Sequence, residues 1–180
     1  IPLEVCRYYH LPAFVGRTTL VVLSSYSGNT EETLSCFEDA LRRSARIVCV
    51  SSNGKLIKEA ERHGCPFVRI PSGIPPRAAL GYSFAPLLAL VWALGLCEPE
   101  EDALSETVGV LRRLREDYGK VDEQNKAFEL ANVLKTRFPI IYSSVRIQAV
   151  GVRWKGQFSE NSKKLAMANV MPEMNHNEIM

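Results

Sequence analysis

Residues 19–43 form the stretch that most constrains the fold of this chain. Residues 19–23 are β-rich and almost wholly apolar, which suits a strand covered on both faces of a sheet. The apolar residues that then recur at helical spacing are Leu34, Phe37 and Leu41. Between strand and helix, Asn29 with Glu32 three residues later has the pattern of a capping box. The sequence therefore predicts a strand, a loop and a helix that begins directly after the loop.

Strand patterns and helix patterns continue to alternate along the chain, which predicts an α/β fold. The further expected strands are residues 3–7, 46–50, 67–70, 139–143 and 169–171. The further expected helices are residues 55–62, 125–137 and 148–158. Strands separated by helices of this length need right-handed crossovers, so we expect parallel sheets. Residues 98–122, between the two strand regions, are rich in charge and predict an exposed linking helix. Their thin apolar stripe consists of Leu104, Val108, Leu111 and Leu114. The expected division is a first domain at 1–97, a helical linker at 98–124 and a second domain at 125–180.

Composition narrows the class of protein. The formal net charge is +2 and no basic block stands out, so we expect no nucleic-acid partner. The five cysteines form no CxxC pair, which favours reduced thiols in a cytoplasmic protein.

Residues 78–97 carry no charge and are long enough to span a membrane, but their Pro and Gly residues favour a buried or interface helix instead. The chain begins without Met and ends inside a new helical pattern, so we expect a fragment of a longer protein.

The loop at residues 25–30 is a candidate phosphate site. Free backbone N–H groups and the positive end of the helix dipole meet there, and the hydroxyl groups of Ser25, Ser27 and Thr30 add three donors. Ser/Gly loops of this kind also occur throughout α/β proteins without binding anything. The loop fits neither the Walker pattern nor GxGxxG, so a nucleotide is not implied. A phosphate monoester is the ligand that the loop chemistry suits.

Four motifs together resemble the sugar isomerase (SIS) family, and within it the bifunctional phosphoglucose/phosphomannose isomerase family. The segments are SSYSGNTEET from residue 24, PRAALGY from residue 76, RWKGQFSENSK from residue 153 and MPEMNHNE from residue 171. The resemblance covers nearly the whole chain. It implies two flavodoxin-like SIS domains, both truncated, because the family's glycine-rich loop before this chain and its Lys and Thr after it are absent.

The resemblance also implies roles for three residues. Arg77 would stabilise negative charge on an enediolate, Glu160 would be the catalytic base, and His176 would assist ring opening in the active site of the neighbouring subunit of a homodimer. Without the resemblance, Arg77 could equally be a solvated residue at a helix start. A carboxylate placed like Glu160 is more often a surface residue, and a lone histidine placed like His176 is usually an exposed bystander. A carboxylate with the ordinary pKa of about 4.3 is a weak base, so we expect partial burial to raise the pKa of Glu160.

The function implied is interconversion of glucose 6-phosphate or mannose 6-phosphate with fructose 6-phosphate through a cis-enediol. No HExxH motif or His/Cys cluster is present, so we expect neither a metal nor a cofactor. One alternative is a regulatory SIS module that binds a sugar phosphate without chemistry. Another is the isomerase half of a glucosamine-phosphate synthase, which usually carries Gln where this chain has Tyr26. The counterparts of Glu160 and His176 favour the enzyme over the regulatory module.

Overall fold

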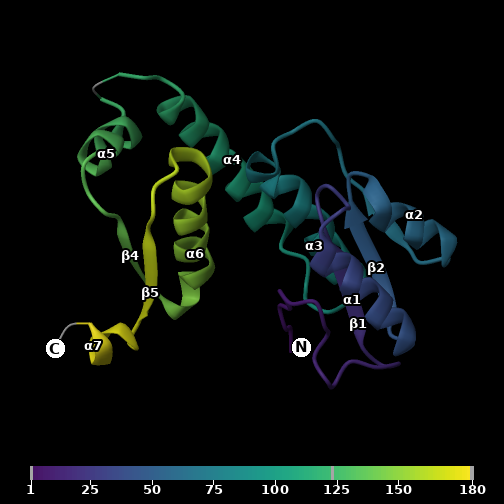
Figure 1. The fold of residues 1–180 in the computed structure, drawn as a ribbon. Coiled ribbons are helices and arrows are strands. Elements are labelled where there is room, and N and C mark those ends of the chain that lie inside the picture. Colours follow the sequence, from purple (N-terminus) through teal and green to yellow (C-terminus); the bar gives the residue numbers. More distant parts are fainter. Residues whose placement is uncertain (1, 123, 179–180) are drawn as a thin grey trace. The chain divides into compact units, whose positions relative to one another are not determined.

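The computed structural model describes residues 2–122 and 124–178. The chain divides into two compact units, Ile1–Pro99 and Glu100–Met180, and each is an α/β unit with its own parallel sheet (Figure 1). This confirms the predicted α/β class and the parallel pairing. The finer division into two domains and a linker remains a prediction.

The first unit is a three-stranded parallel sheet in the order β1-β2-β3. Its elements are β1 (Leu20–Ser24), α1 (Glu31–Arg42), β2 (Arg46–Ser51), α2 (Gly54–Arg62), β3 (Phe67–Arg69), the 3₁₀ turn η1 (Pro76–Ala78) and α3 (Leu80–Ala93). Leu20 is opposite Arg46 and Cys49 is opposite Phe67. Because all three strands are parallel, the loops that follow them lie along one edge of the sheet.

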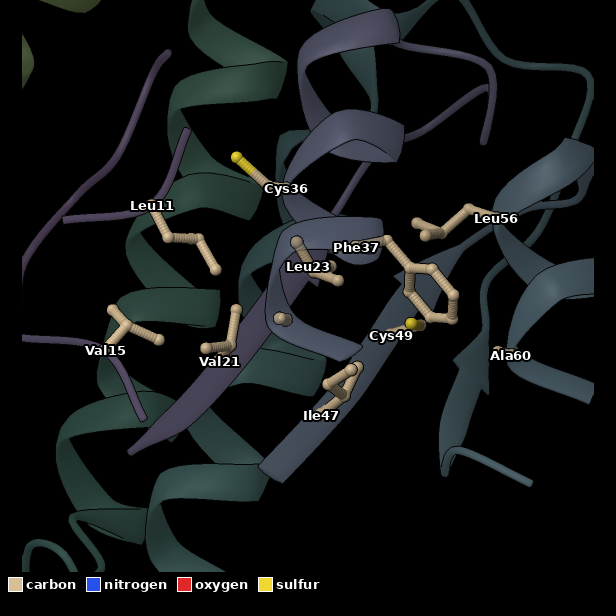
Figure 2. Packing of buried hydrophobic residues seen from close by; sticks show 11 residues of the cluster. Leu11, Val15, Val21, Leu23, Cys36, Phe37, Ile47, Cys49, Leu56 and Ala60 are labelled. Atoms are coloured by element: carbon tan, nitrogen blue, oxygen red, sulfur yellow. The ribbon is translucent and has the colours of Figure 1, made fainter. Parts of the chain in front are cut away.

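The core of the first unit lies between one face of this sheet and the two helices α1 and α2 (Figure 2). Its fully buried members include Phe37 from α1, Cys49 from β2 and Leu56 from α2. The opposite face is covered less completely, although α3 contacts β2. Val22 is 36% exposed and Val68 is 39% exposed, so the expectation of a β1 strand covered on both faces is wrong.

The segment before β1 is not the strand predicted at residues 3–7; it is an irregular stretch that packs on α1. Its backbone carbonyl groups bond to side chains of that helix rather than to a neighbouring strand. The Ser35 hydroxyl donates to the Tyr9 carbonyl at 2.7 Å, and the Cys36 thiol donates to the Tyr8 carbonyl at 3.2 Å. These two bonds lie just after residues 3–7, which form no strand in the structure.

The second unit contains a two-stranded parallel sheet, β4-β5, joined by a helical crossover. Its elements are α4 (Glu101–Tyr118), α5 (Lys126–Leu134), β4 (Ile140–Ser144), the 3₁₀ turn η2 (Val145–Ile147), α6 (Gln148–Gln157), the π-helical turn η3 (Phe158–Ser162), β5 (Met167–Met171) and α7 (Met174–Asn177). The stripe residues of α4 are exposed, as predicted, with Leu111 60% exposed. Asn125 caps α5 by accepting from the amides of Ala127 and Phe128.

Within the apolar segment at residues 78–97, residues 80–93 form α3, which contains Pro86 and has no buried residue. Of the helices in the described parts of the chain, none combines the length and the apolar character that crossing a membrane would require.

Candidate functional site

The loop after β1 brings two of the predicted phosphate-binding hydroxyl groups together. The Ser25 and Thr30 hydroxyl oxygens are 2.7 Å apart and share a hydrogen bond. Ser25 is buried, and its hydroxyl also accepts from the Gly28 amide at 3.1 Å. Ser27 is exposed and accepts from the Asn29 amide at 3.2 Å. The loop is therefore closed by hydrogen bonds of its own hydroxyl groups.

The predicted capping box at Asn29 and Glu32 is wrong. The N-cap residue of α1 is Thr30, whose side chain makes no capping bond to the helix because its hydroxyl is paired with Ser25. The Asn29 side chain instead accepts from the Lys55 amide at 3.1 Å, at the start of α2. The amides of the first turn of α1 thus lack a cap from their N-cap residue, which leaves donors for an anion beside the two hydroxyl groups.

The loops after β1 and β2 approach each other so closely that glycine is required at two positions. A Cβ atom on Gly28 would lie 1.8 Å from the Asn53 carbonyl oxygen. A Cβ atom on Gly54 would lie 2.3 Å from the Ser27 carbonyl oxygen. Both glycines have positive φ, +68° and +85°. The Leu56 amide of α2 also donates to the Gly28 carbonyl at 2.9 Å. The first loop is consequently fixed from two sides, by its own hydroxyl groups and by α2.

Arg77 lies in η1, after the loop that follows β3, and its side chain is exposed. This loop is joined to the candidate phosphate loop by one hydrogen bond, in which the Ile74 amide donates to the Tyr26 hydroxyl at 3.0 Å. The structure thus brings Arg77 to the same edge of the sheet as Ser25 and Thr30. The sequence pattern gave no signal for the contact of Tyr26, because the partner is 48 residues away.

Glu160 lies in the π-helical turn η3 at the end of α6. The turn is followed by Lys163, a non-glycine residue with φ +56°, whose ammonium group donates to the Glu160 carbonyl at 2.9 Å. Single π turns and left-handed non-glycine residues are both over-represented at functional sites. The Glu160 side chain is exposed, so the partial burial expected for a catalytic base is not provided within the described part of this unit.

His176 lies in α7, directly after β5, and is exposed. The segment is held to the sheet by Glu178, whose carboxylate accepts from the Tyr142 hydroxyl of β4 at 2.7 Å and from the Asn169 side chain of β5. The pKa of Tyr142 is raised by this hydrogen bond, by burial and by the Glu178 charge. Glu178 thus anchors the segment that carries His176.

Within the second unit, η3 precedes the amino end of β5 and α7 follows the carboxyl end of β5 (Figure 1). Glu160 in η3 and His176 in α7 therefore lie at opposite ends of the two-stranded sheet. The Lys164 ammonium group donates to the Leu134 carbonyl at 2.8 Å, which holds the segment after η3 beside the entry to β4. The Met167 amide donates to the Pro139 carbonyl at 3.0 Å at the same amino end. His176 instead follows the carboxyl end of β5. One copy of this unit therefore does not bring the two side chains into one site.

The cysteine thiols do not form a reactive or metal-binding centre in the described residues. All five are free, and no group of three His, Cys, Asp or Glu side chains in those residues could hold a metal ion. Burial, with a smaller contribution from Cys65, raises the pKa of Cys49 to about 12, and burial with Cys6 and Asp39 nearby raises the pKa of Cys36 to about 11. Both thiols are thus protonated and weakly nucleophilic near neutral pH.

Comparison with known proteins identifies the class. Residues 123–180 match the family model described as the bacterial phospho-glucose isomerase C-terminal SIS domain. A crystal structure of glucosamine-6-phosphate deaminase from Thermotoga maritima shares the fold, with a TM-score of 0.69, 18% identity and coverage of 93% of this chain and 50% of that chain. The chain is similar to members of the sugar isomerase (SIS) family.

Within that family, this chain is related to the bifunctional phosphoglucose/phosphomannose isomerases. It is 51% identical to the protein of that name from Caldicellulosiruptor bescii, over 100% of this chain and 54% of the relative. It is 40% identical to the one from Aquifex aeolicus, over 99% of this chain and 52% of the relative. The chain thus spans about half the length of these curated relatives.

Proposed function

We propose that this chain contributes to the active site of an aldose–ketose isomerase that interconverts glucose 6-phosphate or mannose 6-phosphate with fructose 6-phosphate. The observation that carries the proposal is the loop at residues 25–30, in which the Ser25 and Thr30 hydroxyl groups meet at the N-terminus of α1. The names of the two relatives supply the substrate class. The exposed cationic side chain of Arg77 at the same edge of the sheet suits an anionic substrate.

The phosphate group of the substrate would bind to Ser25, Ser27, Thr30 and the free amides of the first turn of α1. The binding energy of this distant, unreactive group would then be available to orient the sugar carbons for reaction. Thr30→Val keeps the shape of the side chain and removes its hydroxyl, so we expect KM to rise about tenfold or more. The control is Thr18→Val, an exposed position before β1, at the other end of the strand. A KM that Thr30→Val leaves unchanged would place the phosphate elsewhere.

Glu160 would move the proton of the reaction. Its carboxylate takes the proton from C2 of the open-chain aldose, which leaves an enediolate with its charge on O1. The ketose forms when the carboxyl group returns the proton to C1 and the hydroxyl proton of O2 passes to O1. Arg77 would stabilise the negative charge that develops on the oxygen. His176 would move a proton between O1 and O5 to open the ring, a step that is separate from the transfer between carbons. No metal ion or cofactor takes part in this scheme.

The proposed assembly is a homodimer in which His176 reaches the active site of the neighbouring subunit. The support is the position of Glu160 and His176 at opposite ends of β4 and β5. A second copy could bring its own His176 to the Glu160 end. The same contact would bury Glu160, which is exposed here. We place the protein in the cytoplasm, where its free thiols would remain reduced.

A regulatory SIS module that binds a sugar phosphate without chemistry is the second candidate. Such a module needs the Ser/Thr loop but has no use for a base or for a group that opens the ring. The π-helical turn at Glu160 and the anchored segment at His176 favour the enzyme, because both build local structure around residues that a binding module does not need.

The decisive experiment is Glu160→Gln, measured in the protein expressed from its natural reading frame. Glutamine keeps the shape and removes the basicity, so turnover should fall by about 10²–10⁴-fold and the C2 proton should cease to exchange in heavy water. The matched control is Glu173→Gln, which changes an exposed carboxylate in the same unit. If Glu160→Gln still exchanges C2 deuterium near the wild-type rate, another residue is the base. If the wild-type protein itself shows no exchange, the regulatory module becomes the better interpretation.

A further inference from the structure

Tyr26 contacts the loops that follow all three strands of the first sheet. The residue itself belongs to the loop after β1. Its backbone carbonyl accepts from the Ser52 amide at 3.1 Å and from the Ser52 hydroxyl at 2.6 Å, in the loop after β2. Its side-chain hydroxyl accepts from the Ile74 amide at 3.0 Å, in the loop after β3. One half-buried residue thus joins the three loops at the edge of the sheet where ligands bind in α/β proteins.

The chain between this contact and Arg77 is stiff. Ile74 is followed by Pro75 and Pro76, whose rings fix φ, so few backbone rotations separate the bonded amide from Arg77. On the other side of Arg77, the Ala79 amide donates to the Pro76 carbonyl at 3.1 Å, and Ala79 is fully buried. Arg77 therefore lies between two fixed points, the Tyr26 hydroxyl before it and the buried Ala79 after it.

We propose that Tyr26 is the positioning residue for Arg77, and that its hydroxyl fixes the guanidinium group relative to the phosphate bound at Ser25 and Thr30. This inference rests on the proposed isomerase function. The Tyr26 backbone contacts hold the phosphate loop whatever the side chain is. The hydroxyl alone reaches the third loop, so its removal should move Arg77 without changing the phosphate site.

The first test follows the Ile74 amide directly. Tyr26→Phe removes the acceptor and keeps the ring, so hydrogen exchange at the Ile74 amide should become at least about tenfold faster in the 180-residue chain. The control is Tyr8→Phe, the same chemical change on a ring that is 76% exposed. Equal Ile74 exchange in wild type and Tyr26→Phe would overturn the proposal, because the hydrogen bond would then not hold the loop.

The second test separates positioning from a general structural effect, using the protein expressed from its natural reading frame. Tyr26→Phe should lower kcat by about 10–100-fold and leave KM for hexose 6-phosphate within about twofold, since only the group that meets the developing charge is displaced. In an Arg77→Ala background the same change should have no further effect on kcat. A loss that is the same size in both backgrounds, or a change in KM alone, would show that Tyr26 does not act through Arg77.

The two hypotheses fail in different ways. Wild-type protein without isomerase activity contradicts the proposed function and, with it, the role of Tyr26. Active wild-type protein whose kcat is unaffected by Tyr26→Phe leaves the isomerase in place and refutes the positioning role alone.

Discussion

Gly28 and Gly64 have almost the same backbone conformation, with φ +68° and +65°, but different surroundings. A Cβ atom on Gly28 would overlap the Asn53 carbonyl, whereas one on Gly64 would meet nothing within 4 Å. Gly64→Ala should therefore cost only the left-handed penalty of about 1–2 kcal/mol of unfolding free energy. Gly28→Ala should cost at least about 2 kcal/mol more, because the two loops must separate. Urea unfolding of the two variants makes the comparison, and equal losses would mean that the loops are not in contact.

The hydrogen bond between Tyr142 and Glu178 can be measured through the titration of the phenol. The pKa of Tyr142 is raised because its hydroxyl donates to the Glu178 carboxylate, because of burial, and because the Glu178 charge disfavours a second negative charge. Glu178→Gln removes that charge, so the pKa of Tyr142 should fall toward its ordinary value of about 10. Ultraviolet or NMR titration would record the shift, with Glu173→Gln as the control that leaves it unchanged. An unaltered pKa in Glu178→Gln would mean that α7 is not anchored through this residue.

At the scale of helices and strands, the sequence predicted the elements whose signal is local. The apolar run of β1 and the helical spacing of Phe37 are properties of neighbouring residues, and both elements are present as expected. The errors are contacts between segments far apart in the sequence. The Asn29 side chain accepts from the Lys55 amide of α2 rather than from an amide of α1, and residues 3–7 form no strand. Local patterns contain no information about which distant partner competes for a polar group.

The residues of the candidate site also fall into two groups, those with a local sequence signal and those without one. The hydroxyl-rich loop at a helix N-terminus could be predicted from physical chemistry, since helix ends leave amides unpaired. Glu160 and His176 could not, because an exposed carboxylate and an exposed imidazole have no local signature of function; only the resemblance to the family singled them out. Tyr26 was missed as a contact because its hydroxyl bonds to a loop that follows a different strand.

The attachment of the N-terminal segment to α1 depends on Asp39. Burial alone would raise the pKa of this carboxyl group, but hydrogen bonds from the Leu11 amide and from Arg43 and Arg42, with the Arg43 charge, lower it. A pKa lower in the folded than in the unfolded chain adds stability above about pH 3.9, and this stability is lost as the pH falls through the folded pKa.

Asp39→Asn should therefore destabilise the chain by about 2–3 kcal/mol near neutral pH, because the bonds to a charged acceptor are weakened. The difference from wild type should shrink as the pH is lowered, since the wild-type carboxylate is then protonated. Unfolding by urea at about pH 7 and at about pH 2 tests this dependence. Glu38→Gln, an exposed neighbour on the same helix, is the control. A difference that stays constant with pH would show that Asp39 is not held as the anion.

At the scale of the whole molecule, the two units differ in how well their side chains are packed. Ser25, Thr30 and Arg77 lie in the unit Ile1–Pro99, and Glu160 and His176 lie in the unit Glu100–Met180. The first unit has a continuous core around Phe37, Cys49 and Leu56. In the described part of the second unit the buried apolar side chains are Ala166 and Met174, and Trp154 and Ile140 are about half exposed. The candidate phosphate loop at residues 25–30 is thus built on the better-packed unit.

The position of Glu160 and His176 at opposite ends of one small sheet has a genetic consequence. In the proposed dimer, each active site takes its base from one copy and its ring-opening group from the other. A copy with Glu160→Gln and a copy with His176→Ala would each form inactive dimers alone. Refolded or co-expressed in equal amounts, they should regain about a quarter of the wild-type sites, because half of the dimers are mixed and each mixed dimer has one intact pair. Two defective alleles would then complement each other. Failure of the mixed population to recover activity, with mixed dimers present by mass spectrometry, would mean that both residues act within a single copy.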